Sequence, residues 1–118
     1  MDILKAVRDA GVVGAGGAGF PTHVKLEAQV DYVLANGAEC EPLLHKDAEL
    51  TETFVDKVIR GMEVSMEATG ATKAIFGIKE KRKKAVAVLE EATSSKAIKI
   101  QRNANDCWRF LLTCIGTW

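Results

Sequence analysis

Residues 30–42 read VDYVLANGAECEP, a short apolar run that passes directly into a polar loop. The β-branched and aromatic side chains of residues 30–35 predict a largely buried strand that ends at Asn36. In parallel sheets, ligands bind beyond the carboxyl ends of the strands. We therefore expect the loop at residues 36–42 to contribute to a binding site.

The chain beyond this loop alternates between helical and strand patterns. Residues 47–68 have the apolar spacing of one long helix with a buried face. The segments that follow predict a strand, a helix and a third strand, at residues 72–78, 81–92 and 97–101. Two successive βαβ units require right-handed crossovers. The expected fold class is therefore α/β, a parallel sheet with helices on its faces.

The long helix should bury a continuous apolar stripe. Its members are Leu50, Phe54, Val55, Val58, Ile59, Met62 and Met66. Gly61 lies inside this helix, where glycine costs about 1 kcal/mol relative to alanine. We therefore expect close packing at Gly61, and we expect Gly70 to end the helix.

A glycine-rich loop precedes the first strand. Residues 11–22 read GVVGAGGAGFPT, between a short helix expected after Asp2 and a brief helix at residues 22–26. Glycine has no Cβ, so its backbone can approach a flat, phosphorylated ligand closely. The plain alternative is a glycine-rich surface loop that binds nothing.

Three of these glycines, Gly14, Gly16 and Gly19, also satisfy the pattern G-x-G-x-x-G, and Glu39 follows twenty residues after Gly19. A dinucleotide-binding fingerprint of this kind must follow a strand and open a helix. Here a helix is expected before the loop, and residues 20–21 (Phe-Pro) interrupt its exit. The pattern alone is therefore weak support for a Rossmann fold.

The composition excludes several classes of protein. Sixteen basic and sixteen acidic residues cancel, which argues against a nucleic-acid binder. No apolar run approaches the roughly 20 residues of a membrane span, and the amino end is unlike a signal peptide, so we expect a cytoplasmic protein. Cys40, Cys107 and Cys114 form no C-x-x-C pair, which argues against a disulfide framework or a self-contained iron-sulfur site.

Residues 7–100 resemble the C subunit of Rnf-type ferredoxin:NAD oxidoreductases and its relatives, the cobalamin reductase of propanediol utilisation and the electron-transfer protein associated with proline reductase. They are more distantly similar to the FMN- and NADH-binding flavoprotein subunit of respiratory complex I. The resemblance rests on residues 14–22, on HVKL at 23–26 and on residues 36–42. It implies the FMN-binding domain type of that subunit, in which NADH passes a hydride to FMN and electrons continue to iron-sulfur centres.

The resemblance implies a cofactor site made of Gly14, Ala15, Gly16, Gly17, Gly19, Phe20, Lys25, Asn36, Glu39 and Glu41. The glycine-rich backbone would lie along the flavin, Lys25 would supply a cation to it, and Phe20 would stack on NADH. Asn36 and Glu39 would hydrogen-bond the flavin. Glu41 would face the nicotinamide and is the candidate catalytic residue.

This sequence departs from the complex I pattern at Ala15, where that subunit has arginine, and at Ala38, where it has aspartate. Both agree with the Rnf-type branch. The family's later GEE-type loop, NNVET-like segment and cysteine clusters have no counterpart here, so the resemblance implies a truncated domain at residues 1–101 that is inactive in isolation. Iron-sulfur clusters are then expected only in the missing part or in partner subunits.

Residues 102–118 form an atypical apolar tail that is explained equally by a truncation, a reading-frame change or a divergent end. Such a tail would cover exposed sheet or make a homo-oligomer contact. The expected partners are NADH and other subunits of an electron-transfer complex, which would hold the protein at the cytoplasmic face of a membrane.

A metal site from Glu39, Glu41, His45 and Asp47 matches no established ligand spacing, so none is expected. The competing function is a non-catalytic nucleotide-binding scaffold or an inactive fragment.

Overall fold

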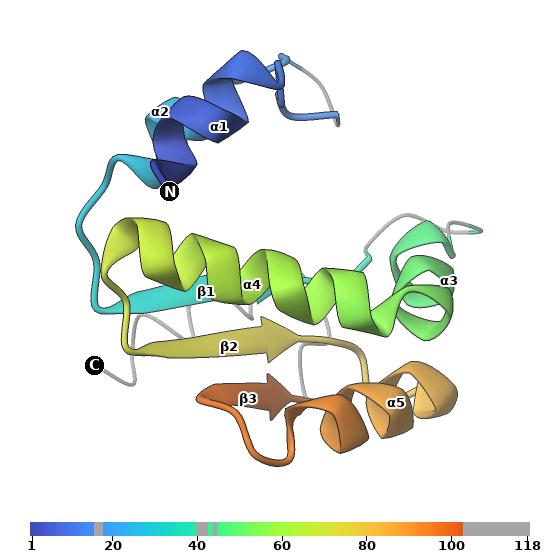
Figure 1. The fold of residues 1–118 in the computed structure, drawn as a ribbon. Helices are drawn as coiled ribbons and strands as arrows, with labels where there is room; N and C mark the ends of the chain where they lie inside the picture. Colours follow the sequence, from blue (N-terminus) through green and yellow to red (C-terminus); the bar gives the residue numbers. More distant parts are fainter. Residues whose placement is uncertain (16–17, 40–42, 44, 103–118) are drawn as a thin grey trace.

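The computed structural model describes residues 1–15, 18–39, 43 and 45–102. Its elements follow in the order α1 (Ile3–Asp9), α2 (Thr22–Leu26), β1 (Tyr32–Asn36), α3 (Lys46–Thr53), α4 (Val55–Thr69), β2 (Lys73–Gly77), α5 (Lys83–Thr93) and β3 (Ile98–Gln101). The three strands form one parallel sheet in the order β1-β2-β3 (Figure 1). The predicted fold class, a parallel α/β sheet with helices packed on it, is confirmed.

Both crossovers run in the same direction along the sheet, so right-handed connections bring α4 and α5 to the same face. Alternate residues of each strand face these helices and form the main core. That core includes Ala74, Phe76 and Ile98 from the strands and Ile59, Met62, Ala85 and Leu89 from the helices. On the opposite face, Leu34 and Ile75 pack against Ala38 in a smaller cluster.

The three strands end level with one another. Asn36 pairs with Gly77 in the register of β1 and β2, and Gly77 pairs with Gln101 in that of β2 and β3. The loop that follows Asn36 therefore begins at the carboxyl edge of the sheet, as the sequence predicted.

The prediction of one long helix at 47–68 is wrong, because the backbone leaves the helical region at Phe54 (φ −127°, ψ 37°) and separates α3 from α4. The break turns the amino-terminal half of the expected stripe toward solvent. Leu50 is 51% exposed and Phe54 is 45% exposed, whereas Ala48 and Thr51 are the buried residues of α3. The rest of the stripe, from Val55 onward, packs in the core.

The expected close packing at Gly61 is also wrong. A Cβ at this position would have no heavy atom within 4 Å beyond its own helix. Gly70 does end α4 in the left-handed conformation, with φ +74°.

The helices α1 and α2 pack against each other and against α4. Asp2 caps α1 by accepting a hydrogen bond from the Lys5 amide at 3.0 Å, and Gly11 ends it with φ +66°. Within the described part of the chain, every helix is too short or too polar to cross a bilayer. The tail at residues 103–118 lies outside the described residues, so its separate character stays a prediction.

Candidate functional site

The glycine-rich loop is closed at its base by pairing between its two flanks. Val13 forms an antiparallel bridge with Pro21, and the Gly14 amide donates to the Phe20 carbonyl at 2.9 Å. This pairing fixes where the chain leaves α1 and enters α2. Gly16 and Gly17 of the predicted site lie outside the described residues.

Two glycines of this loop serve different purposes. Gly19 has φ +63°, a conformation that favours glycine. Gly14 is exposed, and a Cβ there would meet only the Phe20 backbone N and O at 3.6 and 3.8 Å, which are ordinary contacts. The fold therefore needs no glycine at position 14, and the exposed backbone at Gly14 is accessible to a ligand.

The flank of this loop offers an aromatic surface and a cation. Phe20 is 55% exposed, and Val12, Val13 and Val24 are also exposed large apolar residues. Lys25 lies in the last turn of α2 with its side chain exposed. These groups suit a ligand that has a flat ring and an anionic group.

The second loop is fixed onto the end of β2. Its first residue, Asn36, accepts a hydrogen bond from the Ala38 amide through Oδ1 at 3.0 Å. The Gly37 amide donates to the Gly77 carbonyl at 2.8 Å, which continues the sheet ladder. A Cβ at Gly37 would lie 2.6 Å from Cε1 of Phe76, so this loop packs directly on a buried ring.

Glu39 binds the start of α3. Its Oε1 accepts a hydrogen bond from the Asp47 amide at 3.0 Å, while the N-cap residue His45 makes no side-chain cap hydrogen bond. Glu39 thus satisfies an amide of the first turn from eight residues upstream. The Asp47 carboxylate, hydrogen-bonded to Lys46 at 2.6 Å, raises the pKa of Lys46 above its usual value, with a smaller contribution from Glu39.

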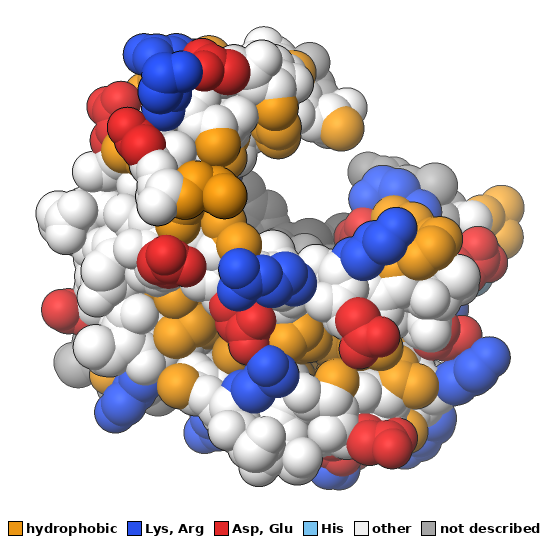
Figure 2. Space-filling view, in the orientation of Figure 1, with side chains coloured by type: hydrophobic (Ala, Val, Ile, Leu, Met, Phe, Trp, Pro, Cys, Tyr) orange, Lys and Arg blue, Asp and Glu red, His pale blue; other side chains and the backbone are white. Residues whose placement is uncertain are grey.

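Figure 1 places the glycine-rich loop at the same end of the molecule as the tips of the strands. Figure 2 shows the surface hollowed between that loop and the side of the molecule that carries α3. Among the described residues of the predicted site, Gly14, Gly19 and Phe20 belong to the glycine-rich loop, and Asn36 and Glu39 belong to the loop after β1. Glu41, the candidate catalytic residue, lies outside the described residues.

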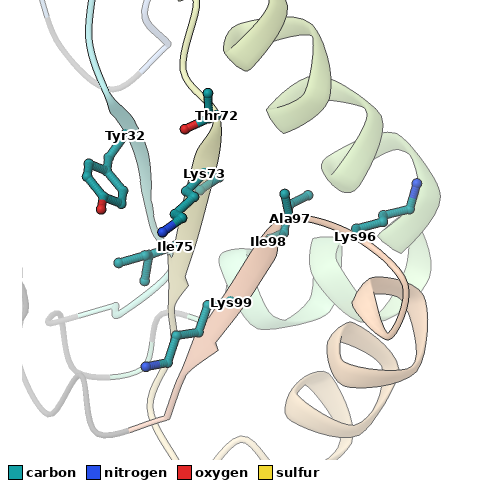
Figure 3. A pocket seen from close by; sticks show the side chains of 9 residues that line it. Tyr32, Thr72, Lys73, Ile75, Lys96, Ala97, Ile98 and Lys99 are labelled. Atoms are coloured by element: carbon teal, nitrogen blue, oxygen red, sulfur yellow. The ribbon is translucent and has the colours of Figure 1, made fainter.

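A cavity that the sequence did not predict lies at the opposite end of the sheet. It measures about 520 Å³ and is lined by Tyr32, by residues 72–75 and by residues 96–99. Tyr32, Ile75 and Lys99 project to one side of the sheet in Figure 3, and Lys96 points away toward α4. The alternation of lysine with apolar residues in β2 and β3 is the signal that could have indicated this half-polar face.

In the part of the chain that the structure describes, no three His, Cys, Asp or Glu side chains gather where they could hold a metal ion. Glu39 and Asp47 meet through a helix cap instead. The described groups of the predicted site are backbone amides, the Lys25 ammonium, the Asn36 side-chain amide and the Glu39 carboxylate. The amides and the ammonium suit an anionic, ring-bearing ligand, whereas a carboxylate accepts hydrogen bonds only from donor groups such as hydroxyls.

Comparison with known proteins points to one family. The family model of the Nuo51 FMN-binding domain matches residues 7–107. The cobalamin reductase PduS of Citrobacter freundii is 54% identical over 87 residues, which cover 74% of this chain and 19% of that protein. A subunit of the Na+-translocating ferredoxin:NAD+ oxidoreductase complex of Acetobacterium woodii is 43% identical over 94 residues, covering 76% of this chain and 21% of that protein.

Among solved structures, an NAD+-reducing NiFe-hydrogenase in the H2-reduced state aligns with a TM-score of 0.69 and 31% identity. The alignment covers 85% of this chain and 20% of the hydrogenase chain. The chain therefore spans about a fifth of the length of the proteins that it resembles.

Proposed function

Since this chain belongs to the family of the Nuo51 FMN-binding domain, we propose that it forms the flavin-side part of an FMN-dependent NADH:acceptor oxidoreductase. Its relatives are named as a cobalamin reductase and as part of a ferredoxin:NAD+ oxidoreductase complex. When bound, FMN would take a hydride from NADH and release single electrons to iron-sulfur centres outside this chain.

The observation that supports the proposal is the exposed, Cβ-free backbone at Gly14, which is followed by the exposed Ala15 and lies near the backbone of Phe20, itself 55% exposed. Because the fold does not require glycine at position 14, close approach of a flat ligand would account for its missing Cβ. The rest of the loop, through Gly16, Gly17 and Gly19, would continue this surface. Phe20 would stack on the nicotinamide nucleotide, and Lys25 would pair with an anionic group.

The loop after β1 would hold the polar edge of the flavin. Asn36 Oδ1 is engaged by the Ala38 amide, so the side chain offers its Nδ2 donors to a ligand. Glu39 would lie along the same edge. We propose that Glu41 faces the nicotinamide and orients it, because hydride transfer requires two ring systems held in near contact.

The proposal extends to partners. The iron-sulfur centres and the terminal acceptor would belong to other subunits or to further parts of a longer protein, at the cytoplasmic face of a membrane. The tail at residues 102–118 would provide a homo-oligomer contact through its apolar side chains.

Titration of the 118-residue chain with FMN, followed by flavin fluorescence, tests the site directly. We expect weak binding, because the family's remaining flavin contacts have no counterpart in this sequence. Lys25→Ala should weaken binding about tenfold, as for the loss of one charge-assisted contact, whereas Lys81→Ala, at an exposed lysine elsewhere, should not.

A second experiment uses a full-length relative. Replacing the glutamate that matches Glu41 by glutamine should impair NADH oxidation more than it reduces flavin content. A chain and a full-length relative that both bind no flavin would favour the scaffold alternative.

A further inference from the structure

We infer that Glu39 is a positioning residue of the proposed flavin site, where it ties the loop at residues 36–39 to the first turn of α3. The inference rests on the proposed function for the identity of the ligand. It adds a role that the sequence did not predict. Glu39 fixes the position of the loop, because its Oε1 accepts a hydrogen bond from a backbone amide of α3.

The first observation is the cap itself. An α-helix begins with backbone amides that have no partner within the helix, and a side chain at the N-cap usually accepts from one of them. At α3 the N-cap residue His45 makes no such hydrogen bond. The Asp47 amide instead donates to Oε1 of Glu39 at 3.0 Å. The helix start and the loop after β1 therefore share one hydrogen bond.

The second observation is the anchor at the other side of the same loop. Gly37 donates to the Gly77 carbonyl at 2.8 Å and has no room for a Cβ above Phe76. Residues 36–39 are thus held between the end of β2 and the start of α3. Gly37 fixes the beginning of the loop, and Glu39 fixes its exit.

The charges around α3 agree with this placement. The Glu39 carboxylate contributes, after Asp47, to the raised pKa of Lys46. A negative charge is also favourable at the amino end of a helix, where the unpaired amides carry partial positive charge. The charge of Glu39 thus already has favourable partners within the protein.

The position of this loop decides what it can offer a ligand. The Asn36 side chain is oriented by its hydrogen bond to the Ala38 amide, one residue before Glu39. Without the hydrogen bond between Glu39 and α3, the turn at residues 36–38 would no longer be held at its carboxyl end. The side-chain N–H groups of Asn36 would then no longer have a fixed orientation. Displacements of about 1 Å at a binding residue are enough to weaken a site substantially.

Three variants of the 118-residue chain test this role: Glu39→Ala, Glu39→Gln and, as the matched control on the first turn of α3, Glu49→Gln. Amide hydrogen exchange at Asp47 and Ala38, measured by NMR without flavin, reports the cap and the turn. We expect Glu39→Ala to speed exchange at both amides at least about tenfold and to weaken FMN binding by a similar factor. Glu39→Gln keeps an acceptor oxygen, so all three quantities should stay within about threefold of the parent, as in Glu49→Gln.

Two results would overturn the inference. If Glu39→Ala leaves exchange at Ala38 unchanged, Glu39 does not position the loop, whatever happens at Asp47. If Glu39→Gln protects both amides yet weakens FMN as much as Glu39→Ala does, the residue acts on the flavin through its charge. If the parent chain and a full-length relative both bind no FMN, the proposed ligand is refuted, and the two amides then decide the positioning role alone.

Discussion

The Cβ that Gly37 lacks would lie 2.6 Å from Cε1 and 2.9 Å from Cζ of Phe76. Phe76 is only 5% exposed, so its ring has little freedom to move away. The loop after β1 therefore rests on the core side chain of the neighbouring strand, and its position is coupled to the packing of the sheet.

Gly37→Ala should destabilise the fold by about 1–3 kcal/mol, because the added methyl group overpacks a closed contact. Gly61→Ala is the matched control, since a Cβ at Gly61 meets nothing within 4 Å and the residue lies inside α4. That change should stabilise the chain by about 0.5–1 kcal/mol through helix propensity. Urea denaturation of both variants measures the two effects, and effects of the same sign would contradict the packing described here.

The ion pair between Glu63 of α4 and Lys96 should make stability depend on pH. The hydrogen bond from Lys96 lowers the pKa of Glu63 below its ordinary 4.5. Because the folded pKa is the lower one, the contribution is present above pH 4.5 and is lost as pH falls through the folded pKa. The stability difference between the parent and Glu63→Gln should therefore be small but measurable at about pH 7 and absent at about pH 2.5.

Glu67→Gln provides the control for this pH dependence, because Glu67 is exposed on the same helix. Lys96→Met should remove most of this pH-dependent increment, and the pairing of Glu63 with Arg60 at 3.6 Å should keep the smaller remainder. An increment that persists in full in Lys96→Met would show that the pair with Lys96 does not cause it.

A pair of identical substitutions tests the break at Phe54. Leu89 is fully buried in α5, so Leu89→Ala should cost about 2–5 kcal/mol by leaving a cavity. Leu50 is 51% exposed in α3, so Leu50→Ala should change stability by less than about 0.5 kcal/mol. Thermal and urea unfolding give both values. If both substitutions reduce the free energy of unfolding equally, Leu50 is buried, as in the single long helix that the sequence predicted.

The two glycines of the first loop should separate folding from ligand binding. Gly14→Ala should leave stability nearly unchanged, since its Cβ would make ordinary contacts, but it should reduce FMN affinity. Gly19→Ala places a side chain at φ +63° and should cost about 1–2 kcal/mol. Unfolding curves and FMN titrations distinguish the two positions. If Gly14→Ala binds FMN as the parent does, the bare backbone at Gly14 has no part in the site.

Sequence patterns predicted the order of elements well, because local apolar spacing encodes the buried face of each strand and helix. The runs around Tyr32, Ile75 and Ile98 became β1, β2 and β3, and Gly70 ended α4 as expected. The break at Phe54 was missed because the apolar spacing continues through it. Apolar spacing depends only on the order of residues along the chain. It therefore does not indicate that the helix axis changes direction at Phe54, which depends on tertiary packing.

The candidate site stays a prediction, and the structure describes the local geometry of only some of its residues. Glycine content indicated bare backbone, which the structure provides at Gly14. The helix cap from Glu39 was not predictable, because its partner Asp47 is eight residues away and the usual cap signal is a polar residue next to the helix. The roles expected of Gly16, Gly17 and Glu41 stay predictions, since these residues lie outside the described part of the chain.

The one-way winding of the sheet has a consequence for any longer protein that contains this unit. Among the described residues the strands proceed from β1 toward β3, so the outer edge of β1 is where a further strand could join and reverse the direction of winding. Such reversals create the crevice in which open α/β sheets hold their ligands. A strand added there would open that crevice directly beside Asn36, so the same edge would complete both the sheet and the proposed flavin site.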